Sequence, residues 1–231
     1  MAPLLNYLKS SILSKVVMAS TGVVLLLFLL GHMIGNTQMY LGQEKMNHYA
    51  ETLQGLGGIL WVIRSVLFIC FVLHVVTSIR LKFLNMDARP VPYKKKEWVK
   101  ASLTSRTMLW SGVTIGLFLV YHIMHFTTKN ANPAYAALRD ALGRPDVYSM
   151  VIFGYQNVLI SLVYLAAMTL LGFHLNHATL SAFQTLGVNH EKYNTIIHTG
   201  SIVLSLIIVI GFASVPLGVL AGIIAPIAGG M

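Results

Sequence analysis

The chain has 231 residues, of which 56% are hydrophobic and only 10% are charged, and its mean hydropathy is +0.72. Soluble domains carry about 25% charged residues and disordered chains combine low hydrophobicity with high charge, so the composition excludes both classes. The formal net charge is +9. A membrane protein concentrates its basic residues on one side of the bilayer. We therefore expect the positive charge to contact lipid, and we expect no nucleic-acid partner.

Five long segments with almost no charge follow one another along the chain: residues 16–43, 52–79, 107–128, 147–190 and 193–231, with Arg64 as the one interruption. A membrane-spanning helix needs roughly 20 apolar residues, and a helix satisfies its own backbone groups in lipid. We therefore predict an all-α integral membrane protein in one transmembrane domain over residues 1–231. The expected helices cover approximately residues 15–40, 57–84, 105–128, 150–178 and 195–222.

The Lys and Arg residues predict the orientation of these helices. Eleven of the 16 fall on the side of the N-terminus: Lys9, Lys15, Arg80, Lys82, Arg89, Lys94, Lys95, Lys96, Lys100, Arg106 and Lys192. Loops rich in Lys and Arg stay in the cytoplasm, so the N-terminus is expected there. The cluster Lys94–Lys96 then contacts anionic lipid, a soluble partner or both. The two loops on the opposite, outer side, residues 40–56 and 129–149, are too short for a separate soluble domain.

Six of the nine histidines lie inside apolar segments, and these are His32, His74, His122, His125, His174 and His177. An ionisable side chain in a membrane helix is costly and indicates function. Given the alternating helix directions, His32 and His122 lie in the outer halves of their helices, whereas His74 and His174 lie in the inner halves. The histidines therefore form two layers, and each layer takes one histidine from each of two helices.

Two layers of paired histidines predict two b-type haems, because haem iron binds one imidazole on each face of the ring. Facing helices of a bundle can supply such pairs, and the helical rise places the layers on the order of 15–20 Å apart. We expect the first four helices to form this haem-binding bundle, with the fifth packed alongside. The spacing leaves open whether His122 or His125, and whether His174 or His177, is the ligand.

Small residues near these histidines fit the approach of a flat macrocycle to the backbone. They are Gly31, Gly35, Gly112, Gly116 and Gly172. Glycine is also common where membrane helices pack closely, so each of them has a structural explanation as well. The single cysteine, Cys70, excludes a Cys-ligated iron–sulfur cluster and a covalent CxxCH haem attachment within this chain.

The same segments resemble a known family. Gly31-His32-Met33-Ile34-Gly35-Asn36, Leu73-His74, residues 121–126 (YHIMHF) and above all residues 172–187 (GFHLNHATLSAFQTLG) are similar to the membrane cytochrome b subunit of succinate dehydrogenase and fumarate reductase (respiratory complex II). The resemblance is to its single-chain, five-helix, di-haem class and covers nearly the whole chain. Ala178 departs from the pattern, in which glycine is usual.

This resemblance implies which histidines bind iron. The axial pairs are His32 with His122 for the distal, outer haem and His74 with His174 for the proximal, inner haem. It also implies a flavoprotein subunit and an iron–sulfur subunit on the cytoplasmic side of a bacterial cytoplasmic membrane. Electrons would pass between the iron–sulfur subunit, the two haems and a membrane quinone, menaquinone or ubiquinone, and the dicarboxylate would bind to a partner.

Several further side chains are expected near the haem propionates or a quinone: Arg64, Arg80, Arg106, His125 and His177. For Arg64, snorkelling to the membrane surface is an equally plain explanation. Two other functions remain open. One is a cytochrome b anchor of a hydrogenase, formate dehydrogenase or nitrate reductase. The other is a transporter, which would bring its histidines to a single depth beside carboxylates.

Overall fold

The computed structural model describes residues 10–88, 103–188 and 190–226. The elements, in chain order, are α2 (Ser11–Thr37), η1 (Gln38–Leu41), α3 (Gln43–Gly55), α4 (Gly58–Asp87), α5 (Leu103–His122), η2 (Ile123–Thr127), η3 (Pro133–Ala137), α6 (Val147–Gln156), α7 (Val158–Thr185) and α8 (Glu191–Leu220). Within the described residues, α2, α4, α5, α7 and α8 are long and apolar enough to cross a membrane. The predicted all-α membrane fold with five spans is therefore confirmed.

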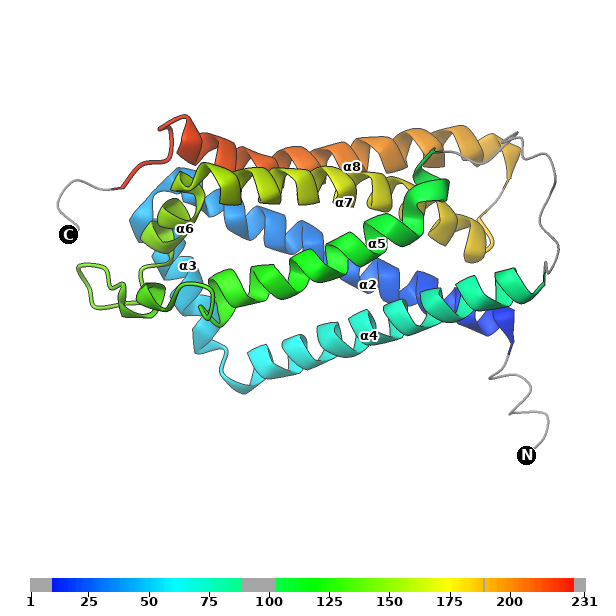
Figure 1. Ribbon diagram of the computed structural model, residues 1–231, viewed down its shortest axis with the longest axis horizontal. Helices are drawn as coiled ribbons and strands as arrows, with labels where there is room; N and C mark the ends of the chain where they lie inside the picture. Colours follow the sequence, from blue (N-terminus) through cyan, green and yellow to red (C-terminus); the bar gives the residue numbers. More distant parts are fainter. Residues whose placement is uncertain (1–9, 89–102, 189, 227–231) are drawn as a thin grey trace.

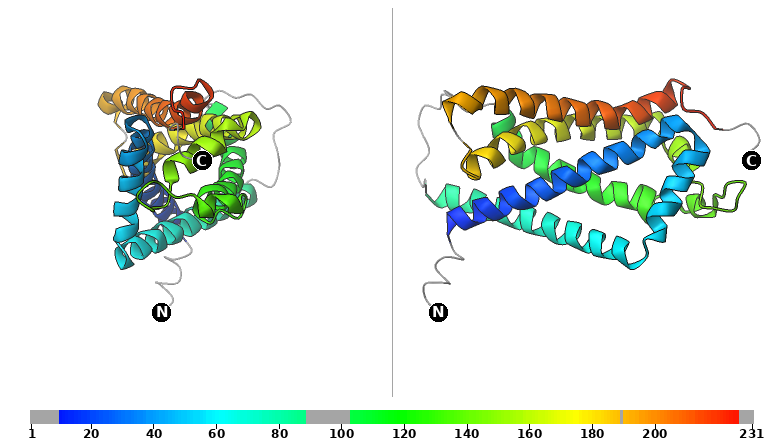
Figure 2. Two further views of the ribbon diagram at one scale, coloured as in Figure 1. Left: turned by 90° about the vertical axis from the view of Figure 1, so that its left-hand side faces the viewer. Right: turned by 180° about the vertical axis from the view of Figure 1, so that it is seen from behind.

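The five long helices run roughly along one axis, and α4 and α8 lie at opposite edges of the assembly (Figure 1, Figure 2). α2 packs against α4, α7 and α8, while α5 packs against α7. We call the end that carries α3, η3 and α6 the outer end, and the end where the chain begins the inner end. These names follow the orientation expected from the basic residues.

Buried apolar side chains are concentrated on one side of the assembly, between α6, α7 and α8. Tyr164, Ile152 and Ile208 are almost completely buried there. By contrast, the 30 residues of α4 include one fully buried side chain, Leu81. On the face of α4 that carries His74, even Leu67 and Phe71 are only half-buried. α4 therefore lies at the edge of the assembly and packs mainly against α2.

The fourth expected span differs from the structure at its start. Residues 150–178 were expected to form one helix, but the chain breaks between α6 and α7 at Asn157, whose backbone is extended. The Asn157 side chain accepts a hydrogen bond from the Ile160 N–H and so begins a new helix. The buried Ser161 hydroxyl donates to the Tyr155 carbonyl at 2.6 Å, which satisfies one of the carbonyls freed at the end of α6.

The outer loops contain structure that the sequence analysis did not predict. α3 fills most of the first loop, and its buried Asn47 reaches the second loop. The Asn47 side-chain amide donates to Asp146 at 3.0 Å and to Asp140 at 3.2 Å, and its oxygen accepts from the Tyr148 N–H. We call the connected side chains of these loops the outer cap network. Its members are Gln43, Glu44, Asn47, Asp140, Arg144 and Asp146.

The carboxylates of this network are stabilised in their charged form. Burial would raise the pKa of Asp140, but hydrogen bonds from Arg144 and Asn47 outweigh burial and hold that pKa below its usual range. Burial opposes ionisation of Asp146 in the same way, and hydrogen bonds from Ser149, Asn47 and Gln43 lower its pKa. Each group therefore releases its proton more readily in the folded protein than in the unfolded chain.

We expect the outer end to lose stability as the pH falls below about 4, the ordinary pKa of an aspartate. A carboxyl group with a lowered folded-state pKa adds stability above its unfolded pKa, and this stability disappears as the pH falls through the folded value. Thermal unfolding of the protein in detergent, followed from about pH 7 to about pH 3, measures the loss. An Asp140→Asn variant should be less stable near neutrality and should depend less on pH. An equal dependence in both proteins would contradict the prediction.

Candidate functional site

The structure brings the two outer histidines together. His32 lies on α2 and His122 ends α5, and their ring centroids are 5.8 Å apart with the rings almost perpendicular. Phe28 and Phe118, each one turn earlier on the same helix, stack on these imidazoles at 5.5 and 6.0 Å. Two imidazoles that share a metal ion have centroids about 6 Å apart, since each metal–nitrogen bond is about 2 Å long. The spacing of this couple therefore fits two axial ligands.

The two inner histidines, His74 and His174, come from α4 and α7, and they lie within electrostatic range of one another. The Nδ1 atom of His74 lies 3.1 Å from the Met18 carbonyl oxygen, and that of His174 lies 3.1 Å from the Ser111 hydroxyl. α2 therefore supports the histidine of α4, and α5 supports the histidine of α7.

The partners of these imidazoles determine which ring nitrogen is free. The Ser111 hydroxyl lies within hydrogen-bond distance of both the Met108 carbonyl and Nδ1 of His174, and when it donates to Met108 it accepts from the Nδ1–H of His174. The Met18 carbonyl can only accept, so Nδ1 of His74 also carries hydrogen. Nε2 of each ring then keeps its lone pair. Metal-bound histidines almost always donate their second ring N–H in this way, so the donor set fits axial ligation of haem iron.

The glycines near the histidines fall into two groups. A Cβ atom on Gly112 would lie 3.5 Å from His174, and Cβ atoms on Gly35 and Gly172 would meet Tyr49 and Val209, so these three permit close side-chain packing. A Cβ atom on Gly31 or Gly116 would meet nothing within 4 Å. Gly31 and Gly116 therefore have open space beside them, and neither is needed for close packing against a neighbouring side chain.

His125 lies in a buried aromatic cluster rather than facing His32. The π-helical turn η2 follows α5, and within it His125 is 2% exposed. Its Nδ1 atom lies 3.0 Å from the hydroxyl of Tyr164 on α7, and Tyr121 stacks on its ring at 5.4 Å. Sequence reasoning left His125 as a spare histidine and missed Tyr164.

The remaining predicted site residues are distributed along the molecule. Arg64 is exposed on α4, and its guanidinium lies 5.1 Å from the centroid of the Trp61 ring, a cation–π contact on the exposed surface. His177 is half-buried three residues after His174, Arg80 is half-buried near the inner end of α4, and Arg106 is exposed near the start of α5. The cluster Lys94–Lys96 lies outside the described residues.

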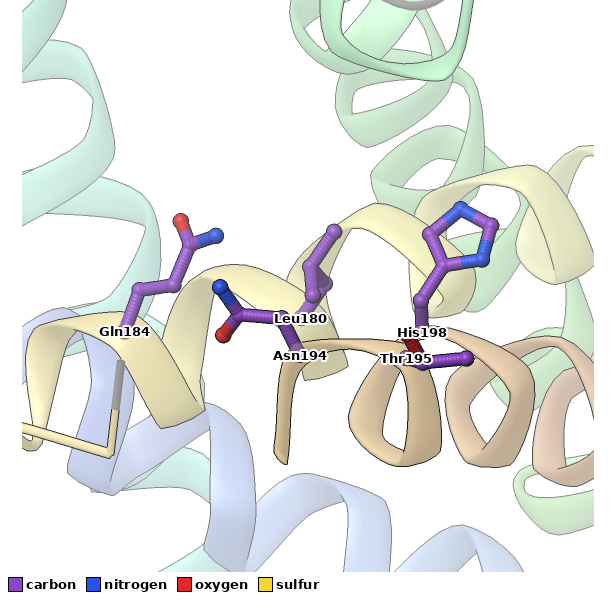
Figure 3. A pocket seen from close by; sticks show the side chains of 5 residues that line it. All are labelled: Leu180, Gln184, Asn194, Thr195 and His198. Atoms are coloured by element: carbon purple, nitrogen blue, oxygen red, sulfur yellow. The ribbon is translucent and has the colours of Figure 1, made fainter. Parts of the chain in front are cut away.

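An open pocket of about 390 Å³ lies at the inner end, between the last turns of α7 and the first turns of α8 (Figure 3). It is lined by Leu180, Gln184, Asn194, Thr195 and His198. Sequence reasoning placed none of these residues in a site. Among the described residues, no group of three or more His, Cys, Asp or Glu side chains lies close enough to hold a metal ion. The convergence of histidines and carboxylates expected of a transporter is therefore not found in this part of the chain.

Comparison with family models, with characterised proteins and with solved structures finds no match to this chain. What the structure itself defines is an all-α membrane protein with five spans, in which His32 lies against His122 and in which His74 and His174 are within electrostatic range of one another.

Proposed function

We propose that this chain is the di-haem cytochrome b subunit of a succinate:quinone or fumarate:quinone oxidoreductase. It would lie in a bacterial cytoplasmic membrane with its N-terminus in the cytoplasm. The observation that carries the proposal is the arrangement of four histidines from four helices as two couples. His32 faces His122 at 5.8 Å, and His74 and His174 hold their Nδ1 atoms on backbone or hydroxyl oxygens.

The chain's residues have distinct roles in this proposal. His32 and His122 would bind the outer haem, while His74 and His174 would bind the inner one, with Nε2 as the ligating atom. When bound, the haems supply single-electron transfer between an iron–sulfur partner and a membrane quinone. Met18 and Ser111 orient the inner ligands, and Phe28 and Phe118 orient the outer ones.

Charged residues support the expected partners at the inner end. Arg80 near the end of α4 and Arg106 near the start of α5 lie there, and in the sequence Lys94–Lys96 falls between these two helices, outside the described residues. Positive charge at this end suits haem propionates, anionic lipid and the acidic surface of a soluble partner. In this proposal the dicarboxylate would bind to the flavoprotein subunit, as the family resemblance implies.

The purified chain, produced with haem available, tests the proposal by a pyridine haemochrome assay and a reduced-minus-oxidised optical spectrum. We expect two b-type haems per chain. A chain that folds without haem would overturn the proposal. Reduction by succinate in the presence of the flavoprotein and iron–sulfur subunits would assign the complex. Reduction by hydrogen or formate through other partner subunits would instead assign the chain to another quinone-linked oxidoreductase.

A further inference from the structure

One phenol connects the outer histidine couple to a third, buried histidine. The Tyr164 hydroxyl lies 3.3 Å from Nδ1 of His122 and 3.0 Å from Nδ1 of His125. Tyr164 is 1% exposed and His125 is 2% exposed, so water does not compete for these contacts. The three groups therefore form a connected chain, with Tyr164 and His125 fully buried, that ends on an expected haem ligand.

The position of Tyr164 is built by several elements. The rings of Phe118 and Tyr155 meet the Tyr164 ring edge-on at 4.9 and 5.1 Å and prevent it from turning away. The π-helical turn η2 aims His125 inward, and such turns are frequent at functional sites. Gly154 leaves room for this arrangement, because a Cβ atom there would lie 3.1 Å from His125.

Hydrogen-bond chemistry allows one direction along this chain of groups if His122 binds iron. With Nε2 on iron, Nδ1 of His122 carries the hydrogen and donates it to the Tyr164 oxygen. The single O–H of Tyr164 is then free to donate to Nδ1 of His125. The following inference rests on the proposed function. We infer that Tyr164 is a positioning residue that fixes the ring orientation of His122. Its contact would also increase the electron donation of that ligand to the outer haem.

This role predicts a selective change in redox potential. An axial imidazole whose second N–H is hydrogen-bonded donates more electron density to iron and favours the ferric form. Tyr164→Phe keeps the ring and removes the acceptor, so we expect the midpoint potential of the outer haem to rise while that of the inner haem stays unchanged. A potentiometric titration of the two-haem protein, monitored by the optical absorption of the haems, shows one reduction step for each haem and so measures both midpoint potentials.

Two matched variants give the experiment its controls. Ser111→Ala removes the corresponding acceptor from His174 and should move the other step of the titration. Tyr155→Phe removes a hydroxyl from the same aromatic cluster and should move neither step. A Tyr164→Phe protein that holds both haems with unchanged potentials would overturn the inference, as would equal shifts of both steps.

A second variant tests the same inference if the Tyr164→Phe protein cannot be obtained in folded form. His125→Leu removes the acceptor of the Tyr164 O–H, which makes the Tyr164 oxygen a weaker acceptor for His122. We expect the same upward shift of the outer step, but a smaller one. No shift in a His125→Leu protein that retains both haems would contradict the inference. Absence of haem from the unsubstituted chain would instead contradict the proposed function.

Discussion

Replacement of His174 by alanine is expected to reduce the haem content from two haems per chain to one, whereas His177→Ala should retain both. The two side chains are three residues apart on α7, but the His174 ring contacts Ser111 and lies within electrostatic range of His74. Under the proposed function, loss of that imidazole would remove one of the two ligands of the inner haem. The pyridine haemochrome assay, expressed per chain, measures the difference.

His198→Ala is the matched control for this pair. His198 is also a histidine of the inner half, but it is exposed in the pocket between α7 and α8 (Figure 3). The variant should keep both haems. If His177→Ala lost a haem and His174→Ala kept both, the ligand assignment on α7 would be wrong, although a di-haem protein would remain.

The second large effect is expected at the outer end and does not depend on any cofactor. Asn47→Ala should destabilise the fold by about 3 kcal/mol, because a buried group left without its partner costs about 1–3 kcal/mol and charged groups cost more. Asn47 is 1% exposed and bonds to Asp140, Asp146 and the Tyr148 N–H. Denaturant or thermal unfolding in detergent, with and without the substitution, measures the loss.

Gln54→Ala provides the comparison on the same helix. Gln54 is exposed near the end of α3, and exposed substitutions of this kind change stability by about 0.5 kcal/mol or less. Equal stabilities of the Asn47→Ala and Gln54→Ala proteins would show that the outer cap network contributes little to folding.

Hydropathy was sufficient to predict the spans because each is longer than a bilayer requires. Alternating helix directions, together with histidine positions, placed His32 and His122 in one layer, and the ring centroids of these two residues are 5.8 Å apart. Their ligation of haem stays a prediction. The break at Asn157 was not predicted, since it depends on one side chain capping a new helix inside an apolar run.

A sequence signal for the supporting groups was present but was not used. Residues 21–32 and 111–122 share a pattern of Thr or Ser, then Gly, Val, and later Phe and His, with identical spacing. Thr21 and Gly22 contact His74, while Ser111 and Gly112 contact His174. The helix pairs α2–α4 and α5–α7 are thus built alike. Comparison of the two segments with each other would have identified both hydroxyl groups.

The Tyr164 contact could not be found in this way. It joins residues 39 and 42 positions apart in the sequence and depends on the π-helical turn at the end of α5. Neither hydropathy nor residue type indicates such a turn. A tyrosine in an apolar helix is equally consistent with simple core packing, and only the three-dimensional arrangement shows that its hydroxyl lies between two imidazoles.

The repeated pattern has a mechanical consequence. On α2, Gly22 lies against the inner histidine His74, and the outer histidine His32 follows 10 residues later. Gly112 and His122 have the same spacing on α5. Ten residues correspond to about 15 Å along a helix. The same helical spacing therefore separates the inner from the outer histidines on both helices. In the proposed di-haem protein, this spacing would be set by continuous helix and would not depend on the conformation of the loops at either end.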